Sequence, residues 1–328
     1  MREEDLSEEL AISVNGLSHS YDGNHFVVND VSFQVKRGEI FGLLGKNGAG
    51  KTTTIKVLTT LIHPTKGDVK VLGYNIKNQG MEIRKRIGVV QQEVSFEFAT
   101  VKENFDLYGF LWGIPKDVRE MRRNELIKAF GLEENTKSSA FDLSGGQKRR
   151  VQVAKEFMHD MELLFLDEPT VGLDPLMRRQ ILDLLRKKAR EENLTIIFTT
   201  HNLEEADYLC DRVAIMDLGK FQALDTTENL KRLYGESKAI EVSLASNGSS
   251  PSYPIFFNRL KNLHPDIEIS RQPASGNPAI LVTKSPEKVI ESIIRVAAEQ
   301  HEKLEWLNVR KSTLEDVFIQ TVSAKQKE

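Results

Sequence analysis

The segment Gly45-Lys46-Asn47-Gly48-Ala49-Gly50-Lys51-Thr52 constrains the chain most, because it fits the pattern G-x-x-x-x-G-K-[ST] of a phosphate-binding loop. Glycines at these positions let successive backbone N–H groups point into one concavity, and a helix that starts near Lys51 adds its positive end. A chance glycine-rich turn is a weak alternative, because the segment follows the short apolar run Glu39–Leu44 and so has the required strand–loop–helix context. We expect Lys51 to reach the terminal phosphates of a nucleotide and the Thr52 hydroxyl to ligate Mg²⁺.

Two further apolar runs end in polar residues that suit phosphate chemistry. The run Leu163-Leu164-Phe165-Leu166-Asp167-Glu168 ends in two carboxylates, of which Asp167 suits a water-mediated hold on Mg²⁺ and Glu168 would polarise an attacking water. The run Thr195–Thr200 precedes His201, whose imidazole would touch a γ-phosphate. Alone, the acids would fit a solvated strand end and the histidine a structural residue. Apolar strands between helices predict a parallel sheet, and ligands bind at the carboxyl ends of such strands, so we expect one shared site.

A second element for anion binding follows later in the chain. Leu143-Ser144-Gly145-Gly146-Gln147 precedes the helical stretch Lys148–Met158, and Ser144 with Gln147 fits a capping box. A cap does not need two glycines, each of which disfavours helix by up to about 1 kcal/mol relative to alanine. Close approach of the backbone to a phosphate explains them.

The order and spacing of these motifs resemble those of the ATP-binding subunits of ABC transporters, and the resemblance covers roughly residues 10–234. It implies an α/β fold, a P-loop NTPase core with an inserted helical subdomain. It also implies ATP and Mg²⁺ as ligands, and an ATPase that converts ATP and water to ADP and phosphate. Members of the family work as dimers in which two ATP molecules lie between the phosphate-binding loop of one subunit and the signature Leu143–Gln147 of the other.

The resemblance also assigns roles residue by residue. Tyr21 matches the aromatic residue that stacks on adenine, and Glu168 and His201 match the catalytic glutamate and the switch histidine. Gln92 matches the glutamine that links Mg²⁺ and the attacking water to the helical subdomain, with the neighbouring Gln91 as the alternative. The expected catalytic residues are Glu168, His201 and Gln92, and the expected Mg²⁺ ligands are Thr52, Gln92 and Asp167. The expected nucleotide-binding residues are Tyr21, Gly45, Lys46, Asn47, Gly48, Ala49, Gly50, Lys51, Thr52, Thr53, Ser144, Gly145, Gly146, Gln147 and Asp174, the last in the loop that crosses to the other subunit.

The pattern of elements predicts two domains. An ABC ATP-binding domain covers 10–234 and contains a helical subdomain at about 101–159, with helices at Asn104–Trp112 and Asp117–Phe130 and a stop at Gly131. The order β-α-β-β-α-β predicts a small C-terminal α+β domain of the split βαβ, ferredoxin-like type over 236–328. Its expected helices are Pro254–Leu263 and Pro286–Gln300, the latter capped by Ser285, and its expected strands are Ala239–Leu244, Ile267–Arg271, Ala279–Thr283 and Leu304–Arg310.

Three segments resemble the branch of the family that exports antibiotics, lipids and polysaccharides: Glu168–Pro175, Thr200–Ala206 and the tail Ser312–Phe318. A short closing helix packed through Leu314, Val317 and Phe318 is a compatible interpretation of the tail. We therefore expect an ATPase that drives export through a separate membrane permease, and that pairs with a second copy or a related ATPase subunit. The expected coupling surface is the groove near Gln92–Phe110, with Phe96, Phe98, Phe105 and Phe110. The alternatives are an importer ATPase with a C-terminal regulatory domain, or a soluble ABC ATPase that acts on ribosomes or DNA.

Composition narrows the partners and the location. Lys and Arg number 45 against 48 Asp and Glu, so a net charge of −3 gives no indication of a nucleic-acid partner, and short runs such as Lys148-Arg149-Arg150 are typical of solvated helix faces. The single cysteine, Cys210, excludes an intrachain disulfide and lies in the helical-looking stretch Leu203–Arg212. No apolar run approaches the ~20 residues of a membrane span, and the acidic N-terminus is unlike a signal peptide. We expect a cytoplasmic protein, peripheral on the inner face of the cell membrane.

Overall fold

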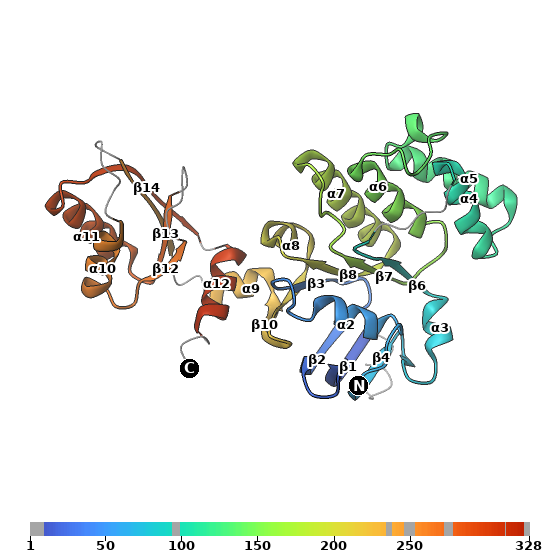
Figure 1. Ribbon diagram of the computed structural model, residues 1–328, viewed down its shortest axis with the longest axis horizontal. Coiled ribbons are helices and arrows are strands. Elements are labelled where there is room, and N and C mark those ends of the chain that lie inside the picture. Colours follow the sequence, from blue (N-terminus) through green and yellow to red (C-terminus); the bar gives the residue numbers. More distant parts are fainter. Residues whose placement is uncertain are drawn as a thin grey trace. The chain divides into compact units, whose positions relative to one another are not determined.

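In the computed structural model, a six-stranded sheet forms the centre of the N-terminal part of the chain (Figure 1). Its strand order is β10-β9-β3-β8-β7-β6, and β3 pairs in parallel with both β8 and β9, while β7 pairs in parallel with β8 and β6. Every residue of β3, β7 and β8 is buried, as expected for strands whose two faces are both covered. The strands are β3 (Ile40–Leu44), β6 (Ile87–Val90), β7 (Leu163–Asp167), β8 (Thr195–Thr200), β9 (Arg212–Asp217) and β10 (Lys220–Thr226).

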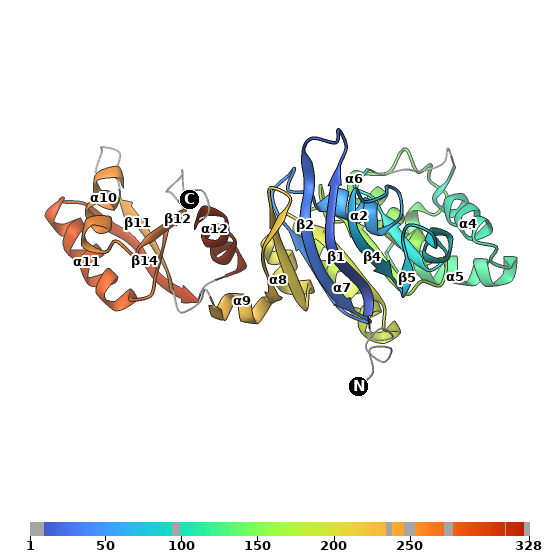
Figure 2. The ribbon, with the colours of Figure 1, turned by 90° about the horizontal axis from the view of Figure 1, so that it is seen from below.

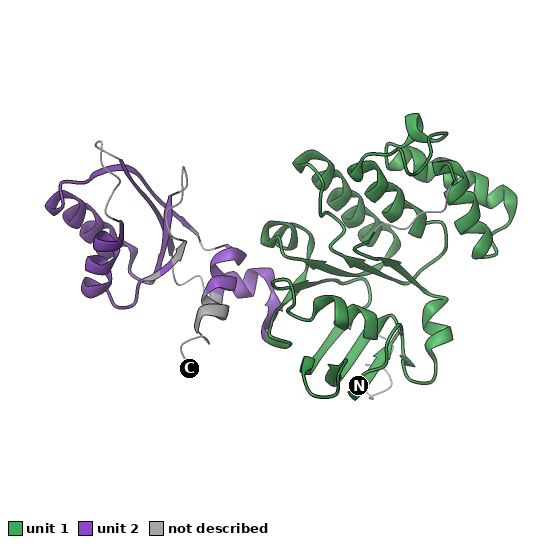
Figure 3. Ribbon diagram, in the orientation of Figure 1, with its two compact units in different colours: residues 1–221 green, residues 222–328 purple. Residues whose placement is uncertain are grey.

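The structure describes residues 10–93, 99–233, 238–245, 253–271, 278–311 and 313–324. The chain divides into two compact units, Met1–Phe221 and Gln222–Glu328 (Figure 3). This division lies ahead of residue 234, because α9 (Thr227–Leu233) packs with α12 (Leu314–Ala324) in the second unit. Among the described residues, every helix is too short or too polar to cross a membrane.

A second, antiparallel sheet belongs to the first unit and has the order β2-β1-β4-β5. Figure 2 shows its two long strands, β1 and β2, in blue. Helix α2 contacts β2 of this sheet and β7 of the central sheet, so it connects the two layers. The elements are β1 (Leu10–Ser20), β2 (Phe26–Lys36), α2 (Lys51–Leu58), β4 (Lys66–Val71), β5 (Tyr74–Asn75) and α3 (Gly80–Arg84).

The inserted helical part contains α4 (Val101–Leu111), α5 (Lys116–Ala129), the short 3₁₀ turn η1 (Glu133–Asn135) and α6 (Gly145–Glu156) (Figure 1). Ser144 with Gln147 begins α6 by the predicted capping box, and Thr100 with Glu103 begins α4 by a second capping box that was not predicted. Gly131 follows α5 in the left-handed backbone conformation, which confirms it as a helix stop. The first unit also contains α7 (Pro175–Glu192) and α8 (Leu203–Leu209).

The prediction that Cys210 lies within a helix was wrong. Helix α8 ends at Leu209, Cys210 has an extended backbone, and β9 begins at Arg212. The reason is tertiary, because Asp211 bonds to the first residue of β3: its backbone N–H donates to the Ile40 carbonyl at 2.8 Å and its carboxylate accepts from the Ile40 N–H at 2.9 Å. The cysteine is buried and free, and burial raises the pKa of its thiol.

The second unit contains the predicted order β-α-β-β-α-β. Its sheet has the order β12-β13-β11-β14 with antiparallel pairs throughout, so β13 lies between β11 and β12 as in a split βαβ fold. Ser285 occupies the cap position of α11 but makes no side-chain cap bond, contrary to the prediction, while Pro286 is the first helical residue. The elements are β11 (Lys238–Ala245), α10 (Tyr253–Leu263), β12 (Glu268–Arg271), β13 (Ala279–Thr283), α11 (Pro286–Glu299) and β14 (Lys303–Lys311).

Candidate functional site

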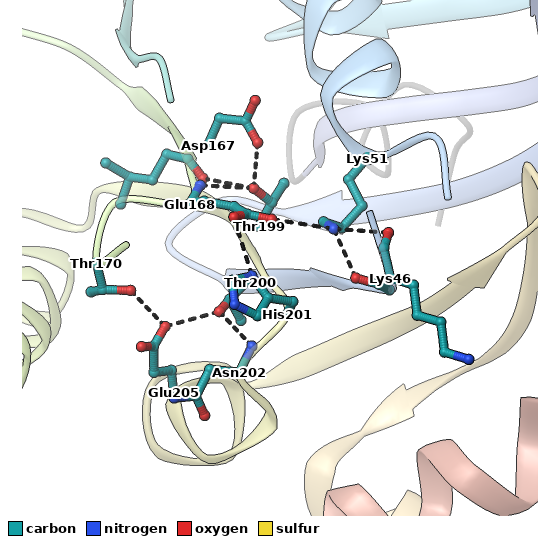
Figure 4. A network of polar contacts seen from close by, with 12 residues as sticks. Lys46, Lys51, Asp167, Glu168, Thr170, Thr199, Thr200, His201, Asn202 and Glu205 are labelled. Carbon is teal, nitrogen blue, oxygen red and sulfur yellow. Dashed lines mark hydrogen bonds and ion pairs between the residues drawn. The ribbon is translucent and has the colours of Figure 1, made fainter. Parts of the chain in front are cut away.

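The phosphate-binding loop joins β3 to α2 and has a shape that its glycines make possible. A Cβ atom on Gly45 would lie 2.4 Å from the Met216 carbonyl oxygen, and one on Gly50, which has a φ of +107°, would lie 2.7 Å from the Val27 carbonyl oxygen. Lys51 is the first residue of α2, where the leading N–H groups of a helix have no intrahelical acceptor. Its Nζ donates to the carbonyl oxygens of Gly45 at 2.7 Å and Lys46 at 3.2 Å (Figure 4). The loop therefore presents a cation and unpaired donors to an anion.

Thr199 of β8 holds the two acidic residues at the end of β7, Asp167 by its carboxylate and Glu168 by its backbone. The Glu168 N–H donates to the Thr199 carbonyl oxygen at 3.2 Å and to its hydroxyl at 3.0 Å, and the Thr199 hydroxyl donates to Asp167 Oδ1 at 2.6 Å. Glu168 has a φ of +49°, which is uncommon for a residue with a side chain. This backbone turn separates the direction of the Glu168 side chain from that of Asp167, and both side chains are buried.

Side chains from the segments that follow β3, β7 and β8 come into contact, as Figure 4 shows. Glu168 Oε1 lies 3.3 Å from Lys51 Nζ, and Glu168 Oε2 lies 3.1 Å from His201 Nδ1. Lys51 and Glu168 are buried, whereas the His201 side chain is 54% exposed. A buried carboxylate between a lysine and an accessible imidazole is an arrangement that can bind an anionic phosphate and accept a proton.

The donor set at this site suits magnesium in the presence of phosphates. Asp167 and Thr52 offer a carboxylate and a hydroxyl, which are hard oxygen ligands of the kind that Mg²⁺ prefers. Within the described ranges there is no cluster of three or more His, Cys, Asp or Glu side chains that could hold a metal ion by itself. A magnesium ion here would therefore take the rest of its ligands from substrate phosphates and water, which is its usual mode in nucleotide sites.

Several predicted site residues lie apart from this contact. The Tyr21 ring is 60% exposed, and its hydroxyl lies 3.3 Å from that of Thr53. Asp174 caps α7 by accepting from the Met177 N–H at 3.0 Å. The signature Ser144–Gln147 starts α6, and among the described residues no hydrogen bond or ion pair joins it to the phosphate-binding loop.

Gln91 and Gln92 are both exposed and are connected to the site through their backbone. The Gln91 carbonyl accepts from Arg149 Nη1 at 2.6 Å and the Gln92 carbonyl from the same atom at 3.3 Å. Both glutamines therefore stay candidates for the role that the resemblance gives to Gln92.

Sequence reasoning missed Arg149, which it placed on a solvated helix face. Arg149 is buried, and besides the two glutamine carbonyls it donates to the backbone oxygens of Asp167 at 2.9 Å, Glu168 at 2.7 Å and Pro169 at 2.8 Å. Burial lowers the pKa of its guanidinium to about 10. Arg149 thus ties α6, which starts at the signature, to the end of β7. The sequence signal for this burial is the position of Arg149 four residues after Gly145 on the same helix, whereas its charge suggested a solvated side chain.

Comparison with known proteins agrees with this geometry. Residues 28–171 match the ABC transporter family. The linearmycin resistance ATP-binding protein LnrL of Bacillus subtilis is 33% identical over 298 residues, which cover 90% of this chain and 94% of that protein. The doxorubicin resistance ATP-binding protein DrrA of Mycobacterium tuberculosis is 38% identical over 233 residues, or 70% of each chain. A solved ATP-binding subunit of an ABC transporter matches with a TM-score of 0.63 and 30% identity over 69% of this chain and 93% of that one.

The chain belongs to the ABC transporter family. It is an ABC ATPase, a nucleotide-binding subunit of the kind found in exporter-type transporters, with a P-loop NTPase core and a small C-terminal sheet domain. ATP is its ligand and substrate.

Proposed function

We propose that the chain hydrolyses MgATP at the meeting point of β3, β7 and β8 and thereby drives export through a membrane permease. The observation that carries the proposal is the contact of Glu168 with both Lys51 and His201, at 3.3 and 3.1 Å. In the proposed reaction, Lys51 and the loop Gly45–Thr52 bind the β- and γ-phosphates, and Tyr21 stacks on the adenine. Glu168 accepts the proton of the attacking water, and His201 contacts the γ-phosphate.

The proposed magnesium site uses Thr52 directly, Asp167 through a water molecule, and Gln92 or Gln91. The ion would neutralise charge on the β- and γ-phosphates. The chain's own residues then have separate tasks, because Thr199 fixes Asp167 through its hydroxyl while the turn at Glu168 directs the catalytic carboxylate elsewhere.

The proposal includes a dimer, formed with a second copy or with a paired ATPase subunit. Ser144 and Gly145 are exposed, and a Cβ atom on Gly145 would meet nothing within 4 Å. The packing of this chain therefore does not explain a glycine at position 145. Close approach of a phosphate held by the Lys51 of another subunit explains it. We assign Ser144–Gln147 and Asp174 to this composite site.

The partner in the membrane is a separate permease, and the subunit works on the inner face of the cell membrane. The resistance functions in the names of two relatives favour export over the importer, ribosome and DNA alternatives. For docking we propose the groove beside Gln91, where a cavity of about 420 Å³ is lined by residues of both subdomains, among them Arg84, Tyr108 and Trp112. Phe110 is exposed nearby, Phe105 is buried in the core, and Phe96 and Phe98 lie outside the described residues.

We also propose the domain limits 10–234 and 236–328, with a helical subdomain at 101–159. A chain ending at residue 235 should then keep a cooperative melt and bind ATP, because the contacts of the site lie before that residue. An insoluble product without a cooperative transition would show that the two parts share a core.

Mixing two inactive variants tests the composite site. Lys51→Ala removes the phosphate-binding cation, and Gly145→Asp places a carboxylate where a phosphate would approach, so each homodimer has only defective sites. A mixed dimer has one site that is native in sequence. With random exchange, activity should return to about a quarter of the wild-type rate, because half of the dimers are mixed and each has one intact site.

Differently tagged variants, pulled down through one tag, establish that mixed dimers have formed. Verified mixed dimers without any ATP hydrolysis would contradict the composite site. Co-purification of the full chain with a polytopic membrane protein encoded by the adjacent gene tests the permease, and a chain recovered alone from solubilised membranes would contradict it.

A further inference from the structure

A buried carboxylate outside the proposed catalytic set lies close to it. Glu205 of α8 is 4% exposed. Its Oε2 accepts hydrogen bonds from the Thr170 hydroxyl at 2.7 Å and the Thr200 hydroxyl at 2.9 Å, and its Oε1 lies 3.1 Å from Arg178 Nε. In Figure 4, Thr170 and Thr200 approach Glu205 from two different segments. One side chain thus connects three stretches of the chain.

Thr170 begins the loop that leads to Asp174. The loop is closed by bonds from the Val171 N–H to the Glu168 carbonyl at 3.3 Å and from the Leu173 N–H to the Thr170 carbonyl at 3.2 Å. The loop ends where Asp174 caps α7, and Arg178 lies in the first turn of that helix. Glu205 therefore contacts the start of the loop through Thr170 and the helix that follows the loop through Arg178.

Thr200 is the residue immediately before His201. Its hydroxyl donates to Glu205 and accepts from the Asn202 N–H at 2.9 Å. The Thr200 hydroxyl thus links Glu205 to the backbone that directly follows His201. The imidazole of His201 lies 3.1 Å from Glu168.

The arrangement makes the positions of Thr170 and Thr200 interdependent. An ionised carboxylate can only accept, and burying it is costly unless donors surround it. Because both hydroxyls bond to the same oxygen, a displacement of Thr170 removes one of its two donors and changes the field that orients the Thr200 hydroxyl. A movement of the loop is in this way transmitted to the residue that carries His201.

We propose that Glu205 is a positioning residue that couples the loop Thr170–Asp174 to His201, so that contact of this loop with a second ATPase subunit sets the orientation of the imidazole. The proposal rests on the dimeric ATPase proposed above and adds a route by which dimer closure regulates turnover. Glu205 itself touches no reacting atom.

A double-mutant cycle in the full-length chain tests the coupling. Glu205→Ala would leave the Thr170 and Thr200 hydroxyls without their carboxylate acceptor and would remove the charge beside Arg178, so it could unfold the chain. The variant of choice is Thr170→Val, which removes one donor at nearly constant shape. We expect Thr170→Val to lower kcat for ATP about tenfold and to change KM less than about twofold. In a His201→Ala background the same substitution should change kcat less than about twofold, because its effect passes through the histidine.

Thr195→Val is the matched control. Thr195 lies at the other end of β8, is as buried as Thr200, and accepts a bond from the Gly38 N–H instead. We expect kcat within about twofold of wild type for this variant, measured in the same assay.

Two outcomes would overturn the coupling. One is an equal loss of kcat from Thr170→Val in the presence and absence of His201, which is what a merely structural role predicts. The other is an unchanged kcat for Thr170→Val in the wild-type background. Neither outcome touches the proposed function, which fails instead if Glu168→Gln retains turnover or if mixed Lys51→Ala and Gly145→Asp dimers stay inactive.

Discussion

Each of the two compact units contains a buried carboxylate that an arginine and threonine hydroxyls hold, but the partners come from very different distances along the chain. In the second unit, Asp316 is 1% exposed. It accepts from the Thr313 N–H at 2.7 Å and the Thr313 hydroxyl at 2.9 Å, and it pairs with Arg310 at 2.7 Å. All of these partners lie within six positions of Asp316.

In the first unit, the Glu205 partner Thr170 is 35 positions away. The same kind of carboxylate contact therefore has a different structural role in each unit. The Asp316 contacts fix the start of α12 and explain the tail motif as a capped helix whose Leu314 and Val317 are buried. The Glu205 contacts fix the geometry between segments that carry the proposed catalytic residues. We expect substitutions of long-range polar contacts in the first unit to change turnover, and those of local contacts in the second to change local stability.

The largest kinetic effect is expected for Glu168→Gln. This variant tests whether long-range polar contacts in the first unit determine turnover. Loss of a positioned general base lowers turnover by about 10²–10⁴-fold. Binding of a labelled ATP analogue should persist, because Lys51 and the loop remain intact. The matched control is Glu162→Gln just before the other end of β7, a partly exposed side chain that pairs with Arg37 and Arg86, for which near-normal turnover is expected. Normal steady-state turnover in Glu168→Gln would remove Glu168 from the mechanism.

Arg149→Met should lower kcat about 10–100-fold and also destabilise the first unit by about 3–5 kcal/mol, because several buried carbonyl oxygens lose their donor at once. The effect is on turnover as well as stability, since those carbonyls belong to the backbone around Asp167 and Glu168. Steady-state kinetics and thermal unfolding measure the two parts. Arg150→Met is the control, because within the described part of the chain this adjacent arginine donates to the carbonyls of Phe130 and Gly131 in the helical part and not to the backbone around Asp167 and Glu168. If Arg149→Met and Arg150→Met lowered kcat and stability equally, the expectation that contacts with the backbone of Asp167 and Glu168 determine turnover would be contradicted.

The sequence predicted the contact of Lys51, Glu168 and His201 because each residue follows an apolar run, and parallel strands bring their carboxyl ends to one edge. The role of Arg149 was missed because a run of three basic residues indicates charge but not burial, and the backbone oxygens that accept from Arg149 lie 18 to 58 positions away. The end of α8 was predicted too late in the chain because a contact between distant segments determines it: Asp211 bonds with Ile40 of β3 and so does not continue the helix. Local patterns predicted the elements, while contacts between distant segments decided the polar network.

Asp316→Asn should affect the second unit alone. Weakening a buried, charge-assisted contact costs about 1–3 kcal/mol of stability, and ATP turnover should stay within about twofold of wild type. Each unit contains one tryptophan: Trp112 directly follows α4 as its C-terminal cap residue, and Trp306 lies in β14. Fluorescence-detected unfolding in a Trp112→Phe background therefore reports on the second unit.

Glu299→Gln provides the surface control for Asp316→Asn. Its ion pair with Arg259 is largely exposed, and such pairs contribute about 0–1 kcal/mol. If Asp316→Asn lost ATP turnover while the unfolding reported by Trp306 stayed unchanged, the result would contradict the expectation that local carboxylate contacts affect stability and long-range contacts affect turnover.

The smallest effect concerns a third buried carboxyl, Glu156 of α6, which has distant partners but, among the described residues, no arginine partner. It accepts from the Tyr108 hydroxyl at 2.5 Å and the Val89 N–H at 3.2 Å, and burial raises its pKa. Folding therefore favours the protonated form. The stability that this group contributes is fully present below its unfolded pKa of about 4.3 and is lost as pH rises through the higher folded value.

Glu156→Gln removes this titration, so the variant's Tm minus that of the wild type should become more positive between pH 5 and pH 8. For a unit of this size each kcal/mol corresponds to about 2–4 °C. Glu241→Gln in the second unit is the control with the opposite sign: burial acts to raise the pKa of Glu241, but hydrogen bonds and the charge of Arg310 hold it below its ordinary value. Wild-type stability from Glu241 is lost only as pH falls through that lowered pKa, so its Tm difference should be flat from pH 5 to pH 8. If the Tm difference for Glu156→Gln is also flat from pH 5 to pH 8, the hydrogen bonds to Glu156 stabilise its ionised form as well as an arginine would. The three carboxyl groups would then differ in how far along the chain their partners lie, and not in the charge of those partners.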